Sequence, residues 1–167
     1  MQHPLVAVIG PTATGKSALG LDLAERLGGE IVGADASQLY RGMDIGTAKL
    51  LPHERRGIPH HQIDVLDILE DATVASYQEG ARRDIDAIYA RGSVPVLVGG
   101  SGLYVRAAVD QLEIPPTDPE VRERLEAEAD ELGTRAMYAR LCELDPESAV
   151  NMQRNNTRRI VRSLEVI

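Results

Sequence analysis

The chain has 167 residues, 43% of them hydrophobic, and a formal net charge of −8 at pH 7. This length suits one domain, or one domain with part of another, and the acidic balance argues against a protein that coats nucleic acid nonspecifically. The single cysteine, Cys142, excludes a disulfide framework, and no apolar run is long enough to span a membrane. We therefore expect a cytoplasmic protein without membrane association, and we take it to be a monomer.

A strand, a glycine loop and a helix are predicted near the start of the chain. Residues 5–9 are apolar and rich in β-branched side chains, which is typical of a buried parallel strand. Residues 17–27 follow a helical period, with Gly28 and Gly29 as the stop. The helical face that we expect to be buried consists of Ala18, Leu21 or Leu23, Ala24 and Leu27.

The segment between this strand and helix fits the phosphate-binding pattern G-x-x-x-x-G-K-[ST], in the order Gly10-Pro11-Thr12-Ala13-Thr14-Gly15-Lys16-Ser17. We call residues 10–17 the glycine loop. Such a loop directs backbone N–H groups and a helix N-terminus at an anion. Lys16 would supply a point charge to the terminal phosphates, and the Ser17 hydroxyl would ligate Mg²⁺. The alternative is a chance glycine turn before a helix; the pattern favours a diphosphate or polyphosphate ligand.

Strands and helices continue to alternate up to residue 102. The pattern predicts strands at residues 30–34, 60–65 and 94–98, and a helix that starts at Thr73 and ends at Gly92. This alternation predicts an α/β fold like that of the P-loop NTPases, a parallel sheet flanked by helices. Ligands bind such sheets at the carboxyl ends of the strands. The glycine loop, Asp35 and the turn at residues 99–102 should meet there.

The sequence changes character beyond Ile114-Pro115-Pro116. Helix starts are predicted at Asp118-Pro119, Thr134, Asp145-Pro146 and Thr157, and no strand pattern remains. We therefore expect an α/β core over residues 1–114 and a small all-helical region over residues 115–167. Residues 151–167 contain four arginines and one acidic residue, which is compatible with a polyanion contact or with a solvated helix face.

Two side chains at the expected ligand site carry reactive groups. Asp35 follows the second strand and could act as a general base, or it could only cap the loop that follows it. Ser101 could donate a hydrogen bond to a leaving group or acceptor, or be a plain turn serine. The strand at residues 94–98 ends in glycines, where an NTPase usually has an acidic residue. These features favour a transferase that uses a pyrophosphate-type donor, or equally a small-molecule kinase.

Longer blocks of the sequence resemble the tRNA dimethylallyltransferases, also called the IPP transferase family. Besides the glycine loop, the matching blocks are residues 34–49, 60–64, 98–104 and 155–165, so the resemblance covers essentially the whole chain. Residues 35–49 are the most specific block. The resemblance implies transfer of a dimethylallyl group from dimethylallyl diphosphate to N6 of the adenine on the 3′ side of the anticodon in certain tRNAs.

The resemblance also implies a role for each matching residue. The glycine loop would hold the diphosphate, with Lys16 and an Mg²⁺ ion on Ser17 neutralising the leaving group. Asp35 would accept the N6 proton, and Ser101 would lie at the reacting centre and touch tRNA. The pocket for the flipped-out adenine would be lined by Asp35, Ala36, Ser37 and Gln38. The further tRNA contacts would be Arg122, Arg158, Arg159 and Arg162.

The sequence departs from the family pattern in three ways. Ala36 replaces a usual serine, Arg154-Asn155-Asn156 stands where Pro-Asn-Asp is common, and the family is about twice as long, so the chain looks shortened. Three other functions remain open: a P-loop kinase for a small metabolite or nucleotide, an adenylate isopentenyltransferase that uses free AMP or ADP, and a catalytically silent module that binds tRNA or nucleotide.

Overall fold

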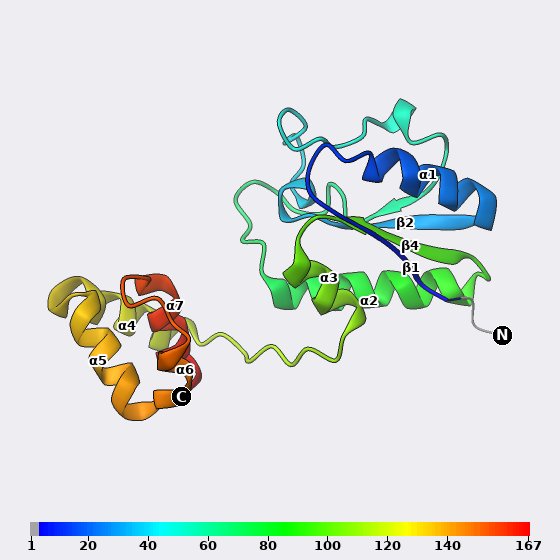
Figure 1. The fold of residues 1–167 in the computed structure, drawn as a ribbon. Coiled ribbons are helices and arrows are strands. Elements are labelled where there is room, and N and C mark those ends of the chain that lie inside the picture. Colours follow the sequence, from blue (N-terminus) through cyan, green and yellow to red (C-terminus); the bar gives the residue numbers. More distant parts are fainter. Residues whose placement is uncertain (1–3) are drawn as a thin grey trace. The chain divides into compact units, whose positions relative to one another are not determined.

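The computed structural model describes residues 4–167 and divides the chain into two compact units, one ending at Glu113 and the other spanning Ile114–Ile167 (Figure 1). The first unit contains every strand that the structure describes, and the second contains only helices and the segments that join them. None of the described helices has the length and apolar character needed to cross a bilayer.

The sheet of the first unit has four parallel strands in the order β1-β4-β2-β3. They are β1 (Val6–Ile9), β2 (Gly29–Ala34), β3 (His60–His61) and β4 (Val94–Gly99). The central strand β4 is almost wholly buried, because β1 and β2 cover its two edges and helices cover its faces. Gly99 of β4 is level with Ile9 of β1 and with Ala34 of β2. The carboxyl ends of these three strands are therefore level, and the residues that follow them leave the sheet at the same end.

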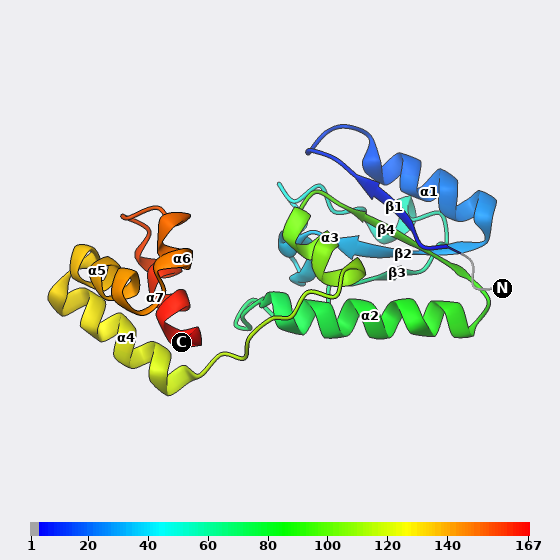
Figure 2. The ribbon, with the colours of Figure 1, turned by 60° about the horizontal axis from the view of Figure 1, so that its bottom comes forward.

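Helices cover both faces of the sheet, which confirms the predicted α/β fold (Figure 2). Helix α1 (Lys16–Leu27) packs on one face, and α2 (Val74–Ala90) and α3 (Gly102–Val109) lie together on the other. Two short 3-10 helices, η1 (Ala36–Leu39) and η2 (Pro52–Glu54), lie in the long connection between β2 and β3. The predicted start at Thr73 is confirmed, since the Thr73 side chain caps α2 by accepting the Ser76 N–H.

The predicted buried face of α1 is partly wrong. Leu21 and Ala24 are buried as expected, but Ala18 and Leu27 are exposed and Gly20 takes a place on the buried face. A Cβ at Gly20 would lie 2.7 Å from a methyl carbon of Val98, so there is no room for a side chain between the helix and the sheet there. Ala18 is two residues away, a rotation of about 200° around the helix, and so faces solvent.

The predicted strand at residues 60–65 is shorter than expected and ends at His61. Gln62 and Asp64 have positive φ values, 56° and 58°, which interrupt an extended strand. Tertiary contacts hold this turn, because the Asp64 N–H donates to the Gln38 carbonyl (3.1 Å) and the Asp64 carboxylate binds Lys49. Long-range contacts thus override the local strand pattern.

The second unit contains α4 (Pro119–Leu132), α5 (Thr134–Leu144), α6 (Pro146–Val150) and α7 (Thr157–Val166). All four begin where the sequence predicts. Asp118, Asp145 and Asn156 cap α4, α6 and α7 with their side-chain oxygens. The helices enclose their own apolar core, which includes Leu125, Met137, Leu141, Ile160 and Leu164.

The close approach of β4 and β2 at Gly99 yields a stability prediction. A Cβ on Gly99 would overlap the carbonyl oxygen and Cβ of Ala34, which belong to a paired strand and cannot move aside. Gly99→Ala should therefore lower the free energy of unfolding by about 1–3 kcal/mol, measured by urea unfolding. Gly102→Ala is the matched control, because a Cβ there meets no atom within 4 Å and should be neutral or slightly stabilising. Equal stabilities of the two variants would contradict the prediction.

Candidate active site

A cavity of about 250 Å³ opens at the carboxyl ends of the strands. Its walls come from the glycine loop, from the segment after β2, from the loop at residues 46–48 and from the end of β4. The residues that line it are Thr12, Ala13, Thr14, Gly15, Lys16, Ser17, Ala18, Asp35, Ser37, Gln38, Gly46, Thr47, Ala48, Val98 and Gly99. The structure thus brings residues 12–17 of the glycine loop and Asp35 to one site. Four other residues predicted at this site are not part of its lining: Gly10, Pro11, Ala36 and Ser101.

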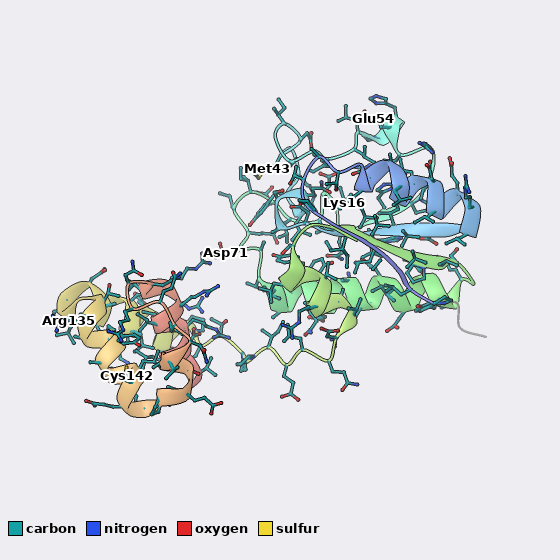
Figure 3. The ribbon with its side chains drawn as sticks, in the orientation of Figure 1. Lys16, Met43, Glu54, Asp71, Arg135 and Cys142 are labelled. Atoms are coloured by element: carbon teal, nitrogen blue, oxygen red, sulfur yellow. The ribbon has the colours of Figure 1, made fainter. Side chains whose placement is uncertain are left out.

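The glycine loop is shaped to expose backbone donors at the start of α1. Ala13 and Gly15 adopt positive φ values of 65° and 83°, and Gly15 occupies the N-cap position without a side-chain cap. The Lys16 ammonium donates to the carbonyl of Pro11, so it lies against the loop. Figure 3 shows Lys16 at the end of the sheet from which α1 begins. Uncapped N–H groups, a helix N-terminus and a lysine together form an anion-binding site.

Asp35 is held through one of its two carboxylate oxygens. Oδ1 accepts the backbone N–H of Ser37 (3.0 Å) and the Ser37 hydroxyl (2.7 Å), so Asp35 caps η1. Within residues 4–167, Oδ2 has no hydrogen-bond partner. The two interpretations of Asp35 are therefore compatible, because one oxygen caps the loop and the other remains available to accept a proton.

The neighbours of Asp35 have different environments. The Ser101 N–H donates to the carbonyl of Ala34 (3.4 Å), which places the start of α3 beside the end of β2. Ala36 packs against the apolar core between the sheet and α2. The Gln38 side chain donates to the carbonyl of Thr47 (2.9 Å) and so ties η1 to the loop at residues 46–48.

Sequence reasoning missed the importance of Lys49. Its side chain is 1% exposed, and its ammonium contacts the carbonyl of Tyr40 (2.6 Å), Asp64 (2.7 Å) and Asp44 (3.0 Å). Burial alone would lower the pKa of Lys49, but the hydrogen bonds to Asp64 and Asp44 outweigh it and hold the pKa above its usual value. Lys49 closes the most specific block of the sequence, yet no local pattern indicates that it is buried.

This ion cluster fixes one wall of the cavity. Lys49 directly follows residues 46–48, which line the cavity, and Asp44 precedes them. Arg55 adds a second cation on Asp64 at 3.2 Å. The loop is therefore anchored on both sides by contacts to the buried Lys49 ammonium. Loss of a carboxylate partner would leave that buried ammonium less well compensated.

The four arginines predicted to contact tRNA fall into two groups. Arg122 and Arg162 both bind Glu165, at 2.6 and 2.9 Å, and the Glu165 side chain is 0% exposed. Arg162 also donates to the carbonyls of Pro115 and Pro116. In the part of the chain that the structure describes, Arg158 and Arg159 are exposed and form no ion pair. The first two hold the helical unit together, and the last two leave their charges at its surface.

The chain is similar to a family of tRNA-modifying enzymes. The family model described as IPP transferase matches residues 38–167. A tRNA dimethylallyltransferase of Rhodococcus jostii is 62% identical over 162 residues, and that of Streptomyces coelicolor is 61% identical over 163. These matches cover 97% and 98% of this chain and 52% of each relative, so the chain spans about half the length of the curated relatives it matches.

Solved structures of tRNA prenyltransferases are also similar to this chain. The full-length tRNA isopentenylpyrophosphate transferase of Bacillus halodurans is 44% identical with a TM-score of 0.63, and the match covers 97% of this chain and 54% of that one. A eukaryotic dimethylallyltransferase acting on tRNA is 28% identical with a TM-score of 0.83, covering 97% of this chain and 40% of the other.

The buried Glu165 yields a prediction for the helical unit. Arg122→Ala removes a donor from Glu165 and should lower the free energy of unfolding by about 1–3 kcal/mol, measured by far-UV circular dichroism in urea. Arg158→Ala should change it by less than about 0.5 kcal/mol. Burial raises the pKa of Glu165, but Arg162 and Arg122 outweigh it and the pKa lies below 4.5. The effect of Arg122→Ala should therefore be complete above pH 4.5 and shrink as the pH falls further. Equal effects of the two variants would contradict this assignment.

Proposed function

The chain belongs to the IPP transferase family, and on that premise we propose that it is a tRNA dimethylallyltransferase. Its substrates are dimethylallyl diphosphate and the adenine on the 3′ side of the anticodon in tRNA, its cofactor is Mg²⁺, and it works as a monomer in the cytoplasm. One observation carries the proposal: an anion-binding loop and a carboxylate with a free oxygen line the same cavity.

The glycine loop binds the diphosphate of the donor in this proposal. The backbone N–H groups before α1 and the Lys16 ammonium surround the phosphate oxygens. These groups interact most strongly with the negative charge that grows on the diphosphate as it leaves, so they stabilise the transition state more than the bound substrate. Lys16 exchanges its contact with the Pro11 carbonyl for one with a phosphate oxygen.

The residues of the cavity fit a magnesium ion held largely by the substrate. No group of three or more His, Cys, Asp or Glu residues among those described could hold a metal by itself. Mg²⁺ commonly takes one or two protein oxygens and completes its shell with phosphate oxygens and water. Ser17, which lines the cavity, offers one hydroxyl oxygen for this purpose. When bound, the ion would neutralise charge on the leaving diphosphate.

Asp35 acts as the base at the acceptor. The adenine leaves the stack of the anticodon loop, since a stacked base cannot reach the donor. Its N6 forms a bond to the allylic carbon while the bond from that carbon to the diphosphate oxygen breaks, and the N6 proton passes to Oδ2 of Asp35. Ser37 fixes the carboxylate through Oδ1. Ser37 and Gln38 form the wall beside the adenine, and Ser101 contacts the adenine from the start of α3.

The arginines have different roles in binding tRNA. Arg158 and Arg159 contact the RNA phosphates, because their charges are exposed and unpaired within the described structure. Arg122 and Arg162 hold α4 and α7 together through Glu165, and Arg162 also donates directly to the carbonyls of Pro115 and Pro116. Their effect on RNA binding is therefore indirect.

Diphosphate binding can be tested without the transfer reaction. Lys16→Met should weaken the binding of inorganic pyrophosphate in the presence of Mg²⁺ by about 10- to 100-fold in isothermal titration calorimetry, because a charged donor is lost. Arg26→Met, at the exposed far end of the same helix, should bind as the wild type does. Unchanged affinity in the Lys16 variant would rule out this role for the glycine loop.

The transfer reaction tests the whole proposal. The chain is mixed with labelled dimethylallyl diphosphate, Mg²⁺ and an anticodon stem-loop that carries adenine 3′ of the anticodon, and label on the RNA is measured. Asp35→Asn should reduce the rate by at least about 100-fold. Asp86→Asn, on the exposed side of α2, should leave it unchanged. Label on free AMP but not on RNA, or ATP turnover without any prenyl donor, would overturn the proposal.

A further inference from the structure

Ile45 lies at the tip of a turn and projects wholly into solvent, with an exposure of 100%. A single exposed apolar side chain needs no explanation by itself. Ile45, however, directly precedes Gly46, the first of three consecutive residues that line the candidate active site. Figure 3 shows Met43, two residues earlier, at the end of the first unit where Lys16 lies. The position of Ile45 beside the cavity, and not its exposure alone, indicates a function at that site.

The turn that carries Ile45 is held from within. The Thr47 hydroxyl donates to the carbonyl of Met43 (2.7 Å), which closes the turn around Ile45. The Asp44 carboxylate contacts the buried Lys49 ammonium at 3.0 Å. The backbone on both sides of Ile45 is therefore fixed, and its side chain is held away from the protein.

The same turn is tied to the acceptor side of the cavity. The Gln38 side chain donates to the carbonyl of Thr47 (2.9 Å), and both residues line the cavity together with Asp35. A nucleobase that enters the cavity toward Asp35 leaves the rest of its strand outside. Ile45 projects beside the wall that this base would pass, so it is placed to meet the neighbours of the base and not the base itself.

The charges near Ile45 suit a nucleic acid. Arg41, four residues earlier, is exposed and forms no ion pair within residues 4–167, and the turn's own acidic residue, Asp44, is engaged by a lysine. The loop at residues 66–71 lies alongside, since the Arg41 N–H donates to the Leu66 carbonyl (2.9 Å). That loop also exposes an apolar side chain, Leu69 (92%). Three acidic residues flank it there and would repel phosphates: Asp67, Glu70 and Asp71.

We propose that Ile45 enters the stack of the anticodon loop in place of the adenine that leaves it. This inference rests on the proposed function and adds to it the residue that keeps the adenine out of the stack. Extrusion of a base costs its neighbours a stacking partner. Proteins that distort nucleic acids insert aliphatic side chains between bases in this way. A β-branched side chain on a fixed turn suits the task, because it has little rotamer freedom to lose.

Unstacking of the target base can be measured without the transfer reaction. The anticodon stem-loop carries 2-aminopurine at the target position, whose fluorescence is quenched while it is stacked. Its amine is at C2 and not at C6, so it accepts no dimethylallyl group during the measurement. Saturating wild-type chain should raise the fluorescence. In Ile45→Ala, the ratio of unstacked to stacked base in the saturated complex should fall about three- to tenfold, because most of the apolar contact is lost.

Leu69→Ala is the matched control. It shortens an aliphatic side chain of the same size and similar exposure, but in the acidic loop beside the turn. Its fluorescence rise should equal that of the wild type. Both variants should keep the wild-type melting temperature, because neither side chain is buried. A lowered melting temperature in Ile45→Ala would assign the residue a structural role in the turn instead.

Three fluorescence results would overturn the inference. They are a wild-type rise in Ile45→Ala, an equal loss in Leu69→Ala, and a wild-type complex in which the target base stays stacked. The equal loss would indicate a general apolar contact, as a protein partner would make. Fluorescence anisotropy establishes saturation, and absence of any RNA binding would overturn both proposals. A rise that depends on Ile45, without transfer to the adenine stem-loop, would overturn the proposed reaction and leave the role of Ile45 in place.

Discussion

The candidate site depends on the register of three parallel strands. Gly99 of β4 pairs with Ile9 of β1 on one side and with Ala34 of β2 on the other. The glycine loop and Asp35 follow Ile9 and Ala34 directly, so the backbone hydrogen bonds of the sheet fix the distance between them. A shift of β4 by one residue would turn every side chain of that strand to the opposite face. The absence of a side chain at Gly99 allows β4 and β2 to remain close up to their last residues.

The second constraint is electrostatic, and it acts on the wall that the sheet does not position. Residues 46–48 lie in a long connection with little apolar packing, yet they line the cavity. Lys49 holds them through two carboxylates and a backbone carbonyl. A buried ammonium tolerates few other arrangements, because any partner it loses leaves charge uncompensated in a poorly solvated place. The cluster therefore defines the shape of the loop more sharply than apolar contacts would.

Local patterns in the sequence predicted the elements well and their mutual contacts poorly. The strands, the glycine loop and the helix starts at Thr73 and Thr157 follow from residues close in sequence, as capping and periodicity do. The end of β3 at His61 and the burial of Lys49 depend on partners far along the chain. Arg122 is bound by Glu165, 43 residues later, which a count of arginines does not reveal. The site was predictable where strand ends define it, and not where long-range ion pairs do.

In the proposed reaction, affinity for the RNA and selectivity for the base come from different residues, and these ion pairs determine which arginines contribute to the affinity. Glu165 engages Arg122 and Arg162, whereas Arg158 and Arg159 at the start of α7 form no ion pair among residues 4–167. Contacts with phosphates do not distinguish one base from another, so these arginines can supply affinity but little choice of base. That choice must come from groups that face the base at the cavity. The Asp35 carboxylate is such a group, because it lines the cavity, Ser37 holds one of its oxygens, and the other oxygen has no partner in the described part of the chain.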